Sequence, residues 1–253
     1  MAEEINDWFR GGAYEDLVSF EIDIAELSSV IVLFVESAGS IAELGLFSQL
    51  QPLRDKLLVF VRNGDFDQNS FIRLGPLDSL GSEIVCVYPW QLEKRPEYDA
   101  PVLNIDSIRA YEAHIADDIT ERLHDRSHAA DFDVKNRRHI LLLICDLISH
   151  MLAVKQKELF QYLNELGVEI DISTFKRYLF TLEKIGFIQS DSRGHNRYYL
   201  ASNNYEFIRY RVDDSKITTD RERRELLYLE YYRENDPRRF SCLQSVLQSG
   251  GVK

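Results

Sequence analysis

Residues 30–47 read VIVLFVESAGSIAELGLF and decide the fold of the first half of the chain. The run VIVLFV (30–35) is continuously apolar, as expected for a strand that is buried on both faces. Two similar runs follow, LLVFV at 57–61 and IVCVY at 84–88, so that the three recur about every 27 residues. This spacing is typical of strand–helix–strand units. We therefore expect an α/β domain with an open parallel sheet.

The segments before and after these strands show the periodicity of helices. Residues 15–28 place Leu17, Phe20, Ile24 and Leu27 on one stripe, and residues 41–50 and 105–123 also read as helices. The polar stretch 124–138 then predicts a boundary. We expect an α/β domain at 1–123, a linker at 124–138, a second domain at 139–212 and a charged helical tail at 213–253.

The second half of the chain has a different pattern of apolar residues. Residues 139–152, 156–166 and 173–185 read as three helices, with Ser173 as a candidate N-cap. Two short apolar segments then flank a tip at 191–196 that contains Gly194, which is typical of a β-hairpin. Three helices followed by a hairpin predict a winged helix-turn-helix domain.

Composition and charge narrow the class of protein. Hydrophobic residues make up 45% of the 253 residues and charged residues 28%, as in a folded protein. Residues 1–125 carry 9 Lys and Arg against 24 Asp and Glu, whereas residues 126–253 carry 21 against 18. Only the second half, at +3, is therefore expected to approach a phosphate backbone.

Apolar runs and cysteines bear on localisation. No apolar run approaches the ~20 residues of a membrane span, and the N-terminus does not resemble a secretory signal. The three cysteines are far apart and match neither a metal site nor a disulfide framework. We expect a cytoplasmic protein with no membrane partner, no metal and no cofactor.

The loop after the first strand carries the chemistry. Glu36, Ser37, Gly39 and Ser40 lie where open α/β sheets bind ligands, outside the carboxyl end of a strand. Glu43 is expected in the first turn of the next helix, where the helix dipole helps to keep a carboxylate ionised. Such a carboxylate can attack a sugar C1′ or stabilise the cation that forms there. The alternative is an ordinary helix acid.

These residues also support a resemblance. The stretch ESAGSIAELG (36–45) resembles the signature of the nucleoside 2-deoxyribosyltransferase-like superfamily. Residues 17–89 are similar to the toxic effector of certain bacterial retrons, in which ESxGSxxELGxF precedes RxKLL and SFIxxGP. This chain has RDKLL at 54–58 and SFIRLGP at 70–76. That family also carries a C-terminal winged-helix domain.

The resemblance implies roles for named residues. Glu43 would be the catalytic glutamate, with the sugar or phosphate bound by Glu36, Ser37, Gly39 and Ser40. Asn69, Ser70 and Phe71 would line the same pocket, unless 69–76 is a plain turn. The family begins with a further strand and a glycine-containing loop that this sequence starts too late to contain, so we expect an N-terminally shortened form of the fold.

The third helix and the hairpin of the second half carry basic residues. Winged helices that contact phosphates place basic groups in these two elements, and Tyr198 and Tyr199 would add a stacking surface. A protein-binding module with a solvated basic face is the alternative. The candidate nucleic-acid-binding residues are Lys176, Arg177, Lys184, Arg193, His195 and Arg197.

Three functions are compatible with these patterns. The first is a toxin that cleaves the base–sugar bond of a deoxynucleotide, NAD or a nucleic-acid base. The resemblance implies that a reverse transcriptase and its multicopy single-stranded DNA (msDNA) with RNA would hold it inactive, in a homo-oligomer or larger nucleoprotein assembly. The second is a non-enzymatic winged-helix DNA-binding regulator with a ligand-sensing α/β domain. The third is a scaffold subunit without activity.

Overall fold

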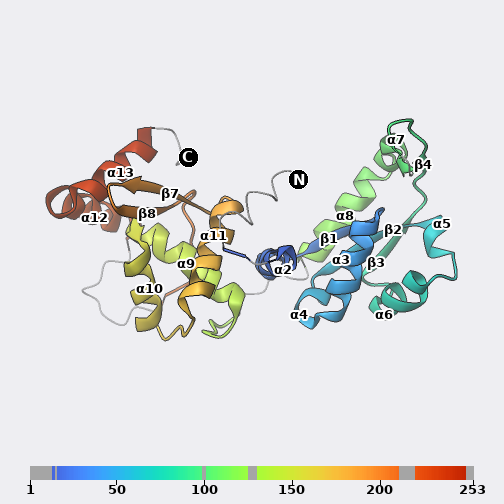
Figure 1. Ribbon diagram of the computed structural model, residues 1–253, viewed down its shortest axis with the longest axis horizontal. Coiled ribbons are helices and arrows are strands. Elements are labelled where there is room, and N and C mark those ends of the chain that lie inside the picture. The colour runs from blue at the N-terminus through green and yellow to red at the C-terminus, as the bar shows by residue number, and fades with distance from the viewer. Residues whose placement is uncertain (1–12, 15, 99–100, 125–129, 211–219, 249–253) are drawn as a thin grey trace. The chain divides into compact units, whose positions relative to one another are not determined.

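The computed structural model describes residues 13–14, 16–98, 101–124, 130–210 and 220–248, which form two compact units (Figure 1). The α/β unit runs from Ala25 to Ala130. The helical unit holds the described residues up to Ile24 and those from Asp131 onward. This division differs from the expected boundaries, which placed residues 1–24 with the α/β domain.

The core of the α/β unit is a three-stranded parallel sheet. Strands β1 (Ile31–Val35), β2 (Leu57–Arg62) and β3 (Val85–Tyr88) follow each other in the order β1-β2-β3. The prediction of a parallel sheet from the three apolar runs is thus confirmed. The central strand β2 is buried over its first five residues, which explains why its sequence shows no alternation of polar and apolar residues.

Helices cover the two faces of this sheet. Helix α3 (Ala38–Gln49) follows β1 and packs beside it, while α8 (Glu112–His124) lies on the other face, where Ile115 joins a core cluster with Phe60 and Trp90. The ring centroids of Phe34 and Phe60 are 4.9 Å apart on that face. The remaining elements are α4 (Gln51–Arg54), α5 (Asn63–Phe66), the π-helical turn η1 (Arg73–Leu77), α6 (Asp78–Leu80), the antiparallel pair β4 (Leu92–Glu93) and β5 (Val102–Leu103), and α7 (Ile105–Arg109).

The helical unit contains three helices and a hairpin, as predicted. The elements are α9 (Arg137–Met151), β6 (Val154–Lys155), α10 (Gln156–Glu165), α11 (Ile172–Lys184), β7 (Ile188–Arg193) and β8 (Asn196–Ala201), with sheet order β6-β8-β7. The hairpin turns at Gly194, whose φ of 64° lies in the left-handed region that glycine favours. The N-cap of α11 is Asp171 and not Ser173, because the Asp171 carboxylate accepts hydrogen bonds from two backbone N–H groups of the first turn.

Two further helices complete the helical unit. The predicted C-terminal helix is present as α12 (Arg221–Asn235) and α13 (Pro237–Gln248). Tyr232 of α12 and Cys242 of α13 are buried in one cluster with Tyr198 and Leu200 of β8. The C-terminal helices therefore form part of the core that supports the hairpin. None of the helices within the described ranges is long and apolar enough to span a membrane.

Long-range contacts explain why the described residues up to Ile24 belong to the helical unit. Helix α2 (Leu17–Leu27) begins in the helical unit, where Phe20 packs against Phe180 of α11 with ring centroids 6.3 Å apart. The Tyr14 hydroxyl donates to Asp23 and lies 2.5 Å from Thr181 Oγ1. The contacts of Phe20 and Tyr14 with α11 join residues more than 150 positions apart, which is why local sequence patterns did not predict them.

Candidate functional site

A cavity lies at the carboxyl edge of the parallel sheet. Its volume is about 370 Å³, and the ends of β1 and β2 and the segments that follow the three strands all contribute to it. Open α/β sheets bind ligands at this edge. The lining residues are Val35, Glu36, Ser37, Ala38, Ile41, Val61, Asp65, Gln68, Ser70, Ile72, Leu77, Trp90 and Leu92.

The loop between β1 and α3 forms one wall of this cavity. Ser37 is the N-cap of α3, and its Oγ accepts a hydrogen bond from the backbone N–H of Ser40 at 3.2 Å. The buried hydroxyl of Ser40 accepts in turn from the N–H groups of Glu36 and Ser37, both at 3.0 Å. These two amides are thus satisfied within the loop. Among the described residues, the first-turn N–H groups of Ala38 and Gly39 have no protein acceptor, so they can donate to a ligand.

We expect Ser40→Ala to lower the free energy of unfolding by about 0.5–2 kcal/mol, the usual cost of removing a helix-capping hydroxyl. The destabilisation arises because the amides of Glu36 and Ser37 no longer have their acceptor. Urea unfolding of the variant measures it. The exposed Ser82, replaced by Ala, is a matched control, and an equal effect of both changes would contradict the capping role.

Two acidic residues line the cavity, and Glu43 is not one of them. Glu36 is exposed at its mouth. Asp65 receives two hydrogen bonds from the Arg62 guanidinium, at 2.9 Å and 2.6 Å, which hold its carboxylate in one orientation. The expectation that Glu43 lies in the first helical turn is wrong, because α3 begins at Ala38 and Glu43 is its sixth residue.

Helix geometry explains where Glu43 lies. Successive residues of an α-helix are about 100° apart, so Glu43 is about 200° around α3 from Ile41, which lines the cavity. Glu43 therefore lies on the other flank of the helix. It is half-buried, and no described residue forms a hydrogen bond or an ion pair with it.

The loop after β2 supplies part of the predicted set. Ser70 lines the cavity, and its Oγ accepts a hydrogen bond from the Arg73 N–H at 3.2 Å. Asn69 and Gly39 are exposed and do not line the cavity, and the Phe71 side chain is 88% exposed. Residues 71–80 form helical turns, so the stretch 69–76 is not a plain turn.

Sequence reasoning missed Asp65, Gln68 and Trp90. Asp65 and Gln68 follow the second apolar run, and Trp90 follows the third. The rule that drew attention to Glu36, a position just beyond a buried parallel strand, could have found all three. Trp90 is 3% exposed and lies near Phe34, so one wall of the cavity is aromatic.

The predicted nucleic-acid-binding residues lie on α11 and the hairpin, but several are already paired. Arg193 contacts Asp191 and Ser245, and Arg197 forms an ion pair with Glu183. The guanidinium of Arg177 lies 5.6 Å from the centre of the Tyr14 ring. The exposed members of the set without a carboxylate partner among the described residues are Lys176, Lys184 and His195.

The expected stacking surface is absent from the hairpin. Tyr198 and Tyr199 are 0% and 4% exposed, because α12 and α13 cover one face of the hairpin and the unit core covers the other. Within the described ranges, no three His, Cys, Asp or Glu side chains are grouped so that they could hold a metal ion.

These features define a class of protein: an α/β unit with a cavity at the carboxyl edge of a parallel sheet, joined to a helical unit with a β-hairpin. Comparison with known families identifies the family within this class. The model of the STM3845 retron effector protein family matches residues 1–190, three quarters of the chain, and the protein belongs to this family. The prediction of a retron effector is thereby confirmed.

Two curated relatives come from Escherichia coli. The "Retron Ec86 putative ribosyltransferase/DNA-binding protein" is 41% identical over 73 residues, which cover 28% of this chain and 24% of the relative. The "Retron Ec73 putative ribosyltransferase/DNA-binding protein" is 32% identical over 66 residues, which cover 26% of this chain and 21% of the relative. The matched stretches thus span less than a quarter of each relative's length, and both names are consistent with glycosyl-transfer chemistry.

Proposed function

We propose that this retron effector is a nucleotide N-glycosidase or deoxyribosyltransferase-like enzyme that acts in the sheet-edge cavity. The observation that carries the proposal is the position of the ESAGS segment. It ends a buried parallel strand, caps the next helix and contributes Glu36, Ser37 and Ala38, whose N–H group is unpaired, to the lining of one cavity. The nucleoside deoxyribosyltransferase-like fold and the winged helix-turn-helix assignment of the helical unit are parts of this proposal.

The chemistry follows from the groups in the cavity. A carboxylate facing C1′ stabilises the positive charge that develops there when the bond between C1′ and the base nitrogen breaks. The base leaves with the bonding electrons and takes up a proton, while the oxygen of water or the nitrogen of a second base bonds to C1′. The N–H group of Ala38 would donate to a sugar or phosphate oxygen, and the Trp90 indole would offer an aromatic wall to the base.

The geometry favours Glu36 as the acting carboxylate. Glu36 lines the cavity, whereas Glu43, the catalytic residue that the family resemblance implies, lies on the other flank of α3. Asp65, fixed by Arg62 and also part of the cavity lining, would bind sugar hydroxyls.

The direct test is release of free bases. Purified full-length protein is incubated with a panel of deoxynucleotides, ribonucleotides, NAD and single-stranded DNA, and the products are separated by chromatography. We expect one class of compound to release its base. If the whole panel stays intact both with the protein alone and with its retron partners present, the enzymatic proposal fails, and the regulator or scaffold function gains support.

The proposed partners are a reverse transcriptase and its msDNA with RNA, which would hold the effector inactive. The helical unit would contact the nucleic acid through the exposed lysines of α11. Phosphate contacts of this kind make binding weaker as salt concentration rises, by counterion release.

We expect Lys176→Ala combined with Lys184→Ala to weaken binding of single-stranded DNA and to lower the salt-dependence slope by roughly 1 for each phosphate that is no longer bound. Fluorescence anisotropy across a salt series measures both quantities. Lys157→Ala, on α10, is the control. An unchanged slope in the double variant would favour a protein partner for this face.

A further inference from the structure

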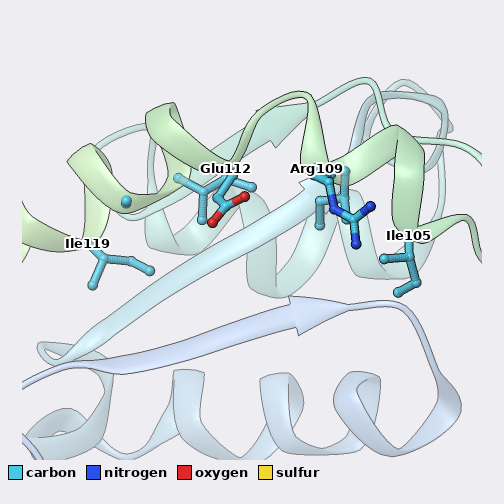
Figure 2. Close-up of a pocket in the computed structure, with 7 residues that line it drawn as sticks. Ile105, Arg109, Glu112 and Ile119 are labelled. Atoms are coloured by element: carbon cyan, nitrogen blue, oxygen red, sulfur yellow. The ribbon is translucent and has the colours of Figure 1, made fainter.

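A second cavity lies along α7 and α8 in the α/β unit, separate from the sheet-edge cavity. It is an open groove of about 370 Å³ lined by four isoleucines and Ala116, with Arg109 and Glu112 as the charged residues. Figure 2 shows these side chains in a row, with Ile119 and Ile105 at its ends and Glu112 and Arg109 between them. The charged residues thus lie side by side in the middle of an apolar strip.

This groove adjoins an uncovered part of the unit. Ile105 is 51% exposed, and Ile108 and Ile119 are only half-buried against the core cluster of Phe60 and Trp90. The same cluster includes Phe34 of β1, which pairs only with β2 among the described strands. Apolar surface beside an edge strand is commonly covered by another chain or element.

The order of the side chains identifies what would cover the groove. A two-fold axis passing between Arg109 and Glu112 reverses the row, so that apolar ends face apolar ends and each Arg109 faces a Glu112 of the other copy. Contacts of this reciprocal kind are the property of a two-fold homodimer interface. We infer that the groove along α7 and α8 is the site at which a second copy of this chain docks.

The charges are available for such a contact. Arg109 is paired with Asp106 at 3.0 Å, but their side chains are 67% and 87% exposed, so that pair contributes little to stability. Glu112 has no ion-pair partner among the described residues. In a dimer, each Arg109 would face a Glu112 of the other copy, and both of these pairs would lie beside apolar surface that excludes water. Like charges facing each other there are strongly unfavourable.

Charge reversal tests the interface. Sedimentation velocity of the full chain over a concentration series should show a dimer, whose dissociation constant rises at least about tenfold in Arg109→Glu and in Glu112→Arg, because like charges then face each other. Glu83→Arg, which reverses an exposed charge elsewhere in the α/β unit, should leave the dimer intact.

Mixing the two variants provides the decisive result. In a heterodimer of Arg109→Glu with Glu112→Arg, both facing pairs join a glutamate of one copy to an arginine of the other, because one variant has glutamate and the other has arginine at both positions. The equimolar mixture therefore replaces the like-charge pairs of each homodimer with two opposite-charge pairs, and it should associate more tightly than either variant alone. The double variant Arg109→Glu with Glu112→Arg in one chain restores opposite charges at both facing pairs, so it should dimerise again.

Circular dichroism of each variant checks that it is folded. A wild-type chain that stays monomeric, a dimer that tolerates both single reversals, a mixture that associates no more tightly than either variant alone, or a double variant that fails to associate would each overturn the inference.

Discussion

Glu36→Gln is expected to lower the rate of base release by at least about 100-fold, because the amide cannot stabilise positive charge at C1′ as the carboxylate does. The change preserves the size of the side chain. The hydrogen bond of Glu36 to Ser40 uses its backbone N–H, so the loop is kept. Initial rates measured on the substrate found in the panel give the effect. The urea-unfolding curve of the variant should match that of the wild type.

Glu43→Gln is the informative comparison, because family resemblance and cavity geometry assign the catalytic role to different glutamates. With Glu36 acting in the cavity, we expect Glu43→Gln to retain most of the activity. A loss confined to Glu43→Gln would contradict the assignment and would move the reaction to the other flank of α3. Equal losses in both variants would mean that the site extends around both flanks.

Asp146→Ala is expected to destabilise the helical unit by roughly 2–4 kcal/mol, since it leaves two backbone N–H groups without their charged acceptor. Asp146 of α9 is fully buried, and its two oxygens accept from the N–H groups of Phe207 and Ile208, both at 2.8 Å. Urea unfolding measures the destabilisation. Glu169→Gln, an exposed change in the same unit, should have almost no effect, and equal stability of both variants would contradict the role of Asp146.

The same carboxylate predicts a pH dependence of stability. Burial raises the pKa of Asp146 above its usual range, although the two amide donors and His150 oppose the shift. The folded state then binds this proton more tightly than the unfolded state. The contribution of protonated Asp146 to the free energy of unfolding is therefore complete below the ordinary Asp pKa of about 4. It declines as the pH rises through the raised pKa of the folded state. Asp146→Ala should lack this decline, which unfolding curves across a pH series would show.

The strands were predictable from the sequence because burial on both faces leaves a continuous apolar run. The start of α3 was not predictable in the same way, because its cap depends on the reciprocal hydrogen bonds of Ser37 and Ser40 and the apolar pattern begins only at Ile41. That error placed Glu43 in the first turn. The break between α7 and α8 at Ala110 and Tyr111 carries neither Gly nor Pro, so the sequence predicted a single helix.

The candidate site was predictable in part. Glu36, Ser37 and Ser70 line the cavity. They could be predicted because segments that follow the strands of an open parallel sheet form its ligand site, whatever their residue types. The availability of the basic residues was not predictable, since Arg197 depends on a partner in α11 and Arg193 on one in α13. Such pairings join residues far apart in the chain and leave no local pattern.

Arg193 shows what this arrangement means for a ligand. Its guanidinium is held by Asp191 on the same strand and by Ser245, which lies 52 residues further along the chain. Asp191 offsets this positive charge, and the Ser245 hydroxyl of α13 helps to fix the orientation of the guanidinium. The last helix thus restricts how far this side chain can turn toward a phosphate.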